Sequence, residues 1–304
     1  MDTTSDASSV RSVDPGRVGL WTHVLDAMPM AAAQEHVAEL GEIGYGAVWI
    51  PEAVGRDPMV AASLLLAGSS DIVLATGIAS IWARDAMSMS AAHKSITEAF
   101  PGRFLLGLGV SHQPAVDYLR GHSYDKPLSR MRAYLDAMDT SLFMAAEPAT
   151  TPVRLLAALG PKMLDLAATR AQGAHPYFVP VEHTAVAREV MGAGPLLCVE
   201  QAVVLETDPT VAREIARRHT SMYLTLPNYT NNLKRFGWTD DDFADGGTDA
   251  VTDAIVAWGD IDAIRAKVAA HHDAGADHVC VQVLAADDQG VPALWRELAP
   301  ALLA

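Results

Sequence analysis

Short apolar runs alternate with helix-period segments along almost the whole chain, and this alternation limits the possible folds more than any other feature. The runs are continuous rather than alternating in polarity, which is typical of strands buried on both faces. The segments between them repeat apolar residues every three or four positions, as at Val37, Leu40 and Ile43. The predicted strands are eight: residues 18–22, 47–50, 72–76, 103–110, 154–159, 174–179, 198–205 and 278–284.

Parallel strands need helical crossovers, and eight strand–helix units predict an α/β fold of the (β/α)8 barrel type. An open doubly wound sheet is the alternative, because periodicity does not show whether a sheet closes. The interval from Asp208 to Asp277 is too long for one crossover and contains an acidic loop from Thr239 to Asp249. We therefore expect an insertion before the last strand, beside the barrel mouth. We expect a single domain over residues 15–304, behind a flexible tail over residues 1–14.

The charge balance argues against polyanionic partners. The chain has 22 Lys and Arg against 37 Asp and Glu, a formal net charge of −15, and no basic cluster, so neither nucleic acid nor an anionic membrane surface is expected to bind. No apolar run reaches the roughly 18 residues that span a bilayer, and the N-terminus lacks a signal-peptide pattern, which predicts a cytoplasmic protein. Cys198 and Cys280 lie in apolar runs without a CxxC pair and are predicted to be buried, reduced thiols. We expect no metal site.

The carboxyl ends of barrel strands carry the reactive groups, so the residues that follow each predicted strand are the candidates for a site. The fourth strand ends in Gly107-Leu108-Gly109-Val110-Ser111-His112, which lacks the third glycine of a dinucleotide fingerprint. The fifth ends in Gly160-Pro161-Lys162 at the predicted start of a helix. A helix N-terminus with an adjacent lysine can bind phosphate, and an ordinary helix start with a solvated lysine is the alternative.

Five segments of the chain, taken in order, carry a resemblance to a known family. They are GYGAVWIPE at 44–52, LATGI at 74–78, GRFLLGLGVSH at 102–112, ALGPKMLDLAA at 158–168 and DAGADHVCVQ at 273–282. Together they resemble the luciferase-like flavin and deazaflavin superfamily, and most closely its oxidoreductases that use coenzyme F420. The resemblance implies a (β/α)8 barrel with an insertion before the last strand, assembled as a homodimer. It also implies that the third strand ends in a non-prolyl cis peptide behind the deazaflavin ring, and the matching bond is Gly77–Ile78.

The same resemblance implies a set of cofactor-binding positions. The third-strand exit would support the ring, the fourth would line the ring and ribityl chain, the fifth would hold the phosphate, and the sixth would form the pocket wall. These positions are Thr76, Gly77 and Ile78; Gly109, Val110 and Ser111; Leu159, Gly160, Pro161 and Lys162; and His175 and Tyr177.

The catalytic positions depart from the family pattern. Relatives that oxidise sugar phosphates have Asp-His at the second exit and Glu at the fourth, whereas this chain has Glu52-Ala53 and His112. Sugar-phosphate dehydrogenation is therefore not expected. Glu52 and His112 remain as groups that could move a proton while a hydride is transferred, and a structural hydrogen-bonding role is the alternative for each. Trp21 and His23 are predicted to lie on the substrate side.

These features predict an F420-dependent oxidoreductase that transfers a hydride to or from a small organic substrate. Two alternatives remain open: an FMN-dependent luciferase-like monooxygenase, and a barrel that binds ligands without catalysis. The sequence does not name the substrate.

Overall fold

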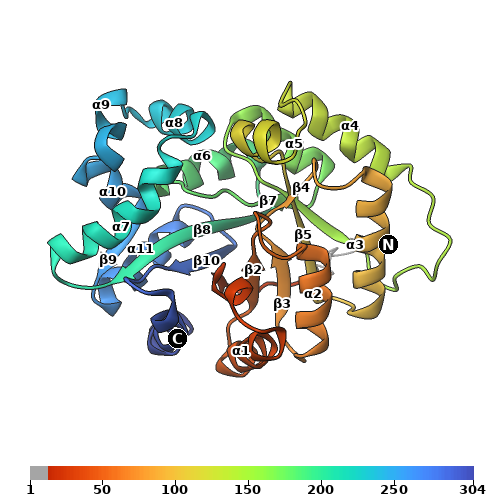
Figure 1. Cartoon of the computed structure of the whole chain (residues 1–304), viewed down its shortest axis with the longest axis horizontal. Helices are drawn as coiled ribbons and strands as arrows, with labels where there is room; N and C mark the ends of the chain where they lie inside the picture. Colours follow the sequence, from red (N-terminus) through yellow and green to blue (C-terminus); the bar gives the residue numbers. More distant parts are fainter. Residues whose placement is uncertain (1–12) are drawn as a thin grey trace, which may run out of the picture.

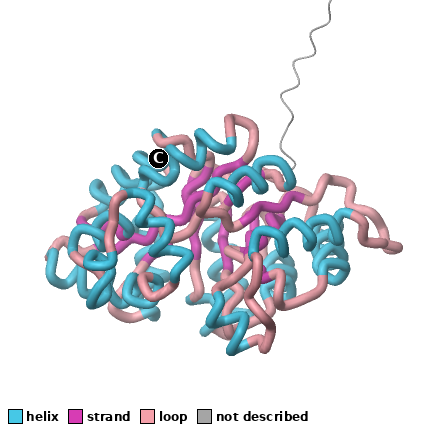
Figure 2. Tube along the Cα trace, turned by 90° about the horizontal axis from the view of Figure 1, so that it is seen from above, coloured by secondary structure: helices cyan, strands magenta, loops and turns pink. Residues whose placement is uncertain are grey.

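The computed structural model describes residues 13–304, and its centre is a closed parallel barrel. Strand β10 pairs with β1 and with β8, which closes a ring of eight strands and confirms the predicted (β/α)8 architecture over the open sheet. Figure 2 shows the strands surrounded by helices. The ring consists of β1 (Val18–Trp21), β2 (Ala47–Ile50), β3 (Val73–Thr76), β5 (Phe104–Gly109), β6 (Val153–Leu156), β7 (Gly173–Ala174), β8 (Leu196–Leu205) and β10 (His278–Val283).

The helices cover the outside of the barrel and bury the outward-facing strand residues. Helix α1 ends at the left-handed Gly44, and α11 is followed by the left-handed Gly275. The barrel helices are α1 (Met30–Ile43), α2 (Pro58–Ala67), α3 (Ala86–Ala99), α4 (Pro127–Asp139), α5 (Pro161–Arg170), α6 (Val181–Met191), α11 (Ile261–Asp273) and α12 (Val291–Leu302).

The predicted insertion lies between β8 and α11, to one side of the barrel in Figure 1. It contains α7 (Pro209–Tyr223), α8 (Pro227–Leu233), α9 (Asp240–Phe243), α10 (Asp249–Ile255) and β9 (Val256–Gly259).

Three local features differ from the sequence prediction. The acidic stretch after Thr239 is not only loop, because a capping box at Thr239 starts α9. Strand β9 was missed, and it pairs with the half of β8 that extends beyond β7. In place of the predicted strand 174–179 the structure has the two-residue strand β7, and beyond it single backbone hydrogen bonds at His175 and Pro176 lead to Phe178, whose φ is 59°.

The predicted flexible tail falls mainly on residues outside the described range. Within that range, Val13 is only 2% exposed and packs in the barrel interior, so Val13 belongs to the folded part of the chain. Cys198 and Cys280 are both buried and form no disulfide, as predicted. Across residues 13–304, no helix is both long and apolar enough to span a bilayer.

Aromatic and imidazole rings fill the barrel beneath its mouth. The Trp49 indole N–H donates to His278 Nε2 at 3.0 Å, and His278 Nδ1 donates to the Gly16 carbonyl at 2.9 Å. His175 stacks on Trp49 with ring centroids 4.3 Å apart. Burial lowers the pKa of both histidines to about 4, so they are neutral at physiological pH. This layer is a rigid floor for the groups above it.

Candidate functional site

The exit of β3 forms a glycine-lined wall at the barrel mouth. The Gly77–Ile78 peptide bond is cis, as the resemblance implied. The Trp21 indole donates to the Gly77 carbonyl at 3.0 Å, and the buried Thr76 hydroxyl donates to the Gly107 carbonyl at 2.7 Å. A Cβ on Gly109 would lie 2.1 Å from Ile78 Cδ1. Glycine is therefore required at 109 because the Ile78 side chain occupies that space.

The exit of β5 continues this wall toward the insertion. Trp82 Nε1 donates to the Val110 carbonyl at 2.9 Å, and Ser111 has a left-handed φ of 56°. His112 Nδ1 lies 3.0 Å from Asn228 Oδ1 at the start of α8. Burial lowers the pKa of His112 despite this hydrogen bond. His112 is thus a neutral imidazole at pH 7 with one nitrogen fixed by the insertion.

The N-terminus of α5 gathers positive charge in an otherwise acidic protein. Gly160 is the N-cap, Pro161 is the first helical residue, and no side chain caps the first turn. Arg235, from the insertion, brings both terminal guanidinium nitrogens to 3.0 Å from the position of a Gly160 Cβ. Lys162 is exposed beside it, and the Leu159 carbonyl accepts from His183 Nε2 at 2.9 Å. Arg235 was not among the residues predicted from the sequence, because its approach to Gly160 depends on how the insertion folds back.

Glu52 is held by four hydrogen-bond donors. Its carboxylate accepts from the Ser80 amide at 2.7 Å, from both Arg84 terminal nitrogens at 3.0 and 2.9 Å, and from Arg120 at 3.2 Å. The Glu52 side chain is 6% exposed. Arg84 also pairs with Asp57, the N-cap of α2. Glu52 therefore joins the β2, β4 (Ala79–Ser80) and β5 exits, and its oxygens are already occupied.

The residues predicted at the sixth and first exits take two different positions. His175 is buried, and its Nε2 lies close below Gly77, 3.3 Å from the position of a Cβ there. It supports the wall from within rather than lining it. Tyr177 packs on Trp21 with centroids 5.1 Å apart and hydrogen-bonds Tyr223 and Gln282 at 2.9 and 2.8 Å. His23 is half exposed and faces Asp288 at 3.2 Å.

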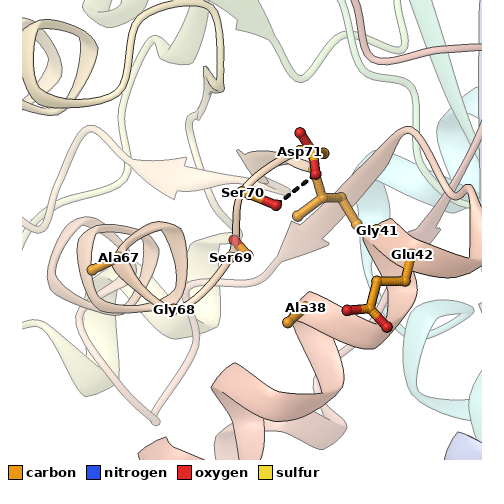
Figure 3. Close-up of a pocket in the computed structure, with 9 residues that line it drawn as sticks. Ala38, Gly41, Glu42, Ala67, Gly68, Ser69, Ser70 and Asp71 are labelled. Carbon is orange, nitrogen blue, oxygen red and sulfur yellow. Dashed lines mark hydrogen bonds between the residues drawn. The ribbon is translucent and has the colours of Figure 1, made fainter.

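Two surface hollows flank the barrel, and they lie at opposite ends of the strands. One of about 430 Å³ lies beside the mouth, between Trp82, Arg84 and Arg130. The other, of about 300 Å³, lies between α1, α2 and the start of β3, where Glu42 and the Ser70–Asp71 pair line it (Figure 3). That hollow is at the amino-terminal end of the strands, the end that contributes to stability rather than to chemistry in barrels of this type.

The geometry defines a (β/α)8 barrel protein with a backbone wall, a neutral histidine and a cationic helix N-terminus around one mouth. The sequence profile of the luciferase-like monooxygenase family matches residues 9–278. The chain therefore belongs to the luciferase-like monooxygenase family.

Individual relatives agree with this assignment. A Mycobacterium tuberculosis protein named as a candidate coenzyme F420-dependent oxidoreductase is 24% identical over 321 aligned residues, 85% of this chain and 92% of the relative. The solved F420-dependent secondary alcohol dehydrogenase with an F420-acetone adduct superposes with a TM-score of 0.76 at 12% identity, covering 95% of this chain and 99% of that one. The FMN-bound oxygenating constituent of 3,6-diketocamphane monooxygenase from Pseudomonas putida superposes with a TM-score of 0.63 at 15% identity, covering 94% of this chain and 98% of that one. Both superpositions show a shared fold.

The contacts of Glu52 predict a large stability effect when its charge is removed. Glu52→Gln should lower the free energy of unfolding by about 3 to 5 kcal/mol, because it leaves Arg120 without its carboxylate partner and Arg84 with Asp57 alone. Denaturant unfolding measures the change. Glu147→Gln is the matched control, since Glu147 pairs with Lys94 at the surface with 61% exposure, and it should change stability by less than about 1 kcal/mol. Equal effects in the two variants would contradict an anchoring role.

Proposed function

We propose that this protein is a coenzyme F420-dependent oxidoreductase that transfers a hydride to or from a small organic substrate. The observation that carries the proposal is the combination of the Gly77–Ile78 wall with the cationic N-terminus of α5 at one barrel mouth. The relative from Mycobacterium tuberculosis and the F420-dependent alcohol dehydrogenase, which are named for this cofactor, support the same choice.

The residues present fit a deazaflavin with a phosphate-bearing side chain. Gly77 and Ile78, with Gly109 beneath the Ile78 side chain, offer a surface free of protruding polar groups to a flat ring, and Val110 and Ser111 continue it. At the α5 N-terminus, backbone N–H groups, Lys162 and Arg235 offer donors and positive charge to a phosphate. Leu159, Gly160 and Pro161 would complete that end. Thr76 acts from below by holding β3 against β5.

The bound deazaflavin would supply a carbon that accepts or donates a hydride, and the substrate proton is left to the protein. His112 is the residue we assign to that proton. With Nδ1–H donated to Asn228, its neutral Nε2 carries a lone pair that can accept a proton from a substrate hydroxyl. Glu52, whose oxygens are occupied by four donors, we assign to positioning Arg84 and Arg120. Trp21 supports the wall, and His23 and Tyr177 bound the substrate side.

An FMN-dependent monooxygenase is the second candidate, because the family and the FMN-bound neighbour support it. Titration of the purified protein with F420 and with FMN, followed by ligand fluorescence, separates the two. We expect F420 to bind and FMN to bind at least about tenfold more weakly. Arg235→Ala should weaken F420 binding by roughly 10- to 100-fold, the loss of one charged hydrogen bond.

Arg265→Ala is the control for that titration, since Arg265 is exposed on α11 and pairs only with the neighbouring Asp262 among the described residues. It should leave the affinity unchanged. Tight binding of FMN alone, with oxygen consumption, would refute the F420 assignment. F420 that binds without changing its redox state across a broad substrate panel would indicate a barrel that binds without catalysis.

His112 should control the acid limb of the pH–rate profile. The catalytic form is the neutral imidazole, and because burial lowers the pKa, the rate of alcohol oxidation should fall only below the ordinary histidine value of about 6.5. His112→Gln should lower turnover by about 10²- to 10⁴-fold without changing F420 affinity. Asn228→Asp places a carboxylate against Nδ1, which raises the histidine pKa, so the limb should move to higher pH. An unchanged limb in Asn228→Asp would exclude His112 as the titrating base.

We also propose that the chain forms a homodimer through α2. This helix is apolar on all sides, yet Val60 and Leu64 are 59% and 43% exposed, with Val54 exposed just before the helix and Met87 exposed on α3. A helix apolar all round is normally covered. Sedimentation velocity should show a species of twice the chain mass, and Val60→Asp with Leu64→Asp should convert it to the monomer. A monomeric wild type would refute this interface.

A further inference from the structure

Glu200 is a buried carboxyl that neither the wall nor the proposed proton transfer uses. It lies on β8 opposite Cys280 of β10 and is only 2% exposed. Its Oε2 accepts a hydrogen bond from the Phe178 amide at 3.0 Å. Its Oε1 is buried without a hydrogen-bond partner among the described residues. Burying a carboxylate without enough hydrogen-bond donors costs free energy, and the cost is smaller when the carboxyl group is neutral.

A continuous set of contacts leads from Glu200 to the wall of the candidate site. Phe178, which Glu200 holds, is in the left-handed region with φ 59°, where a bulky side chain needs support from its surroundings. The preceding residue, Tyr177, packs on Trp21. Trp21 in turn donates its indole N–H to the Gly77 carbonyl. The conformation of the β7 exit and the position of the Gly77 carbonyl are therefore linked by direct contacts.

Glu200 is also the member of its cluster that changes charge near neutral pH. Burial raises the pKa of Glu200 to about 8, against a smaller opposing effect of the Phe178 amide. The other titratable groups around it stay neutral at this pH, because burial raises the pKa of the hydroxyls and of the thiol and lowers that of the imidazole. These groups are Tyr177 at the β7 exit, Tyr223 and His219 on α7, Tyr229 on α8 and Cys280 on β10.

We propose that Glu200 is a positioning residue for the cofactor site: its neutral carboxyl holds Phe178, and through Tyr177 and Trp21 it keeps the Gly77 wall in place. An ionised carboxylate with one donor among aromatic rings is unstable where it lies. Ionisation therefore favours a rearranged β7 exit and a displaced wall. The inference rests on the proposed function only for the identity of the bound ligand.

The test uses Glu200→Gln, which keeps the size and the acceptor for Phe178 but does not titrate. The first readout needs no cofactor: ¹⁹F NMR of the full chain labelled with 5-fluorotryptophan, with the Trp21 resonance assigned through Trp21→Phe. In the wild type this resonance should shift with a midpoint near pH 8, and in Glu200→Gln it should not shift over the same range. Trp295, a buried residue of α12 that packs in the outer core away from the mouth, is the internal control, and its resonance should not shift in either protein.

The second readout is F420 affinity. If only the neutral form binds, the wild-type Kd should rise about tenfold from pH 7 to pH 9 relative to Glu200→Gln. The ionisation of F420 itself affects both proteins equally and cancels in the ratio. Glu200→Ala, which leaves the Phe178 amide without its acceptor, should bind F420 more weakly at every pH, and Glu200→Gln should restore binding.

The two proposals fail in different ways. If F420 does not bind at any pH, the proposed function fails while the ¹⁹F measurement still decides the role of Glu200. A Trp21 shift of equal size in Glu200→Gln, or no shift between pH 7 and 9 in the wild type, overturns the role of Glu200 even if F420 binds. If Glu200→Gln does not fold, the wild-type measurement alone still tests the proposal, because the absence of a Trp21 shift between pH 7 and 9 overturns it.

Discussion

The hydrogen bond from the Trp21 indole to the Gly77 carbonyl is the contact on which the barrel mouth depends. It joins the first strand to the exit of the third across the barrel interior. A Cβ on Gly77 would lie 2.4 Å from Trp21 Nε1, so this approach requires glycine at position 77. On the far side of the same segment, Ile78 fills the space left by Gly109. The absence of side chains at Gly77 and Gly109 thus allows Trp21 and β5 to contact the backbone segment 77–78 from opposite sides.

Positive charge at the barrel mouth is confined to a few residues of an acidic protein. A chain with a net charge of −15 repels anions at long range, so an anionic ligand needs a local site in which backbone dipoles and a few cations outweigh the total. The α5 N-terminus with Lys162 and Arg235 provides this. Arg84 and Arg120 do not, because Glu52 and Asp57 neutralise them. Their ion pairs with Glu52 and Asp57 hold the strand exits together instead.

The barrel was predictable because continuous apolar runs locate most of its strands. The cis Gly77–Ile78 bond was predicted from the resemblance of its segment to the luciferase-like superfamily, and the structure contains it. Partners distant in sequence were not predictable. Arg235 reaches Gly160 and Asn228 reaches His112 only because the insertion folds over the mouth. Likewise, Glu52 resembled a catalytic acid at a strand exit, and only the folded chain shows four donors around it.

These long-range partners also divide the mouth into two parts. The exits of β3 and β5 present mostly backbone and small side chains, which suits a flat cofactor whose shape does not vary. The opposite side, from β7 and β8 to the insertion, is built from tyrosines, a histidine and a buried acid, with Tyr177 hydrogen-bonded to both Tyr223 and Gln282. Apart from Asn228, which fixes His112, side chains on α7 and α8 can change without disturbing the strand pairing of the barrel. Substrate choice is therefore expected to reside in the insertion, while the exits of β3 and β5 keep the cofactor chemistry constant.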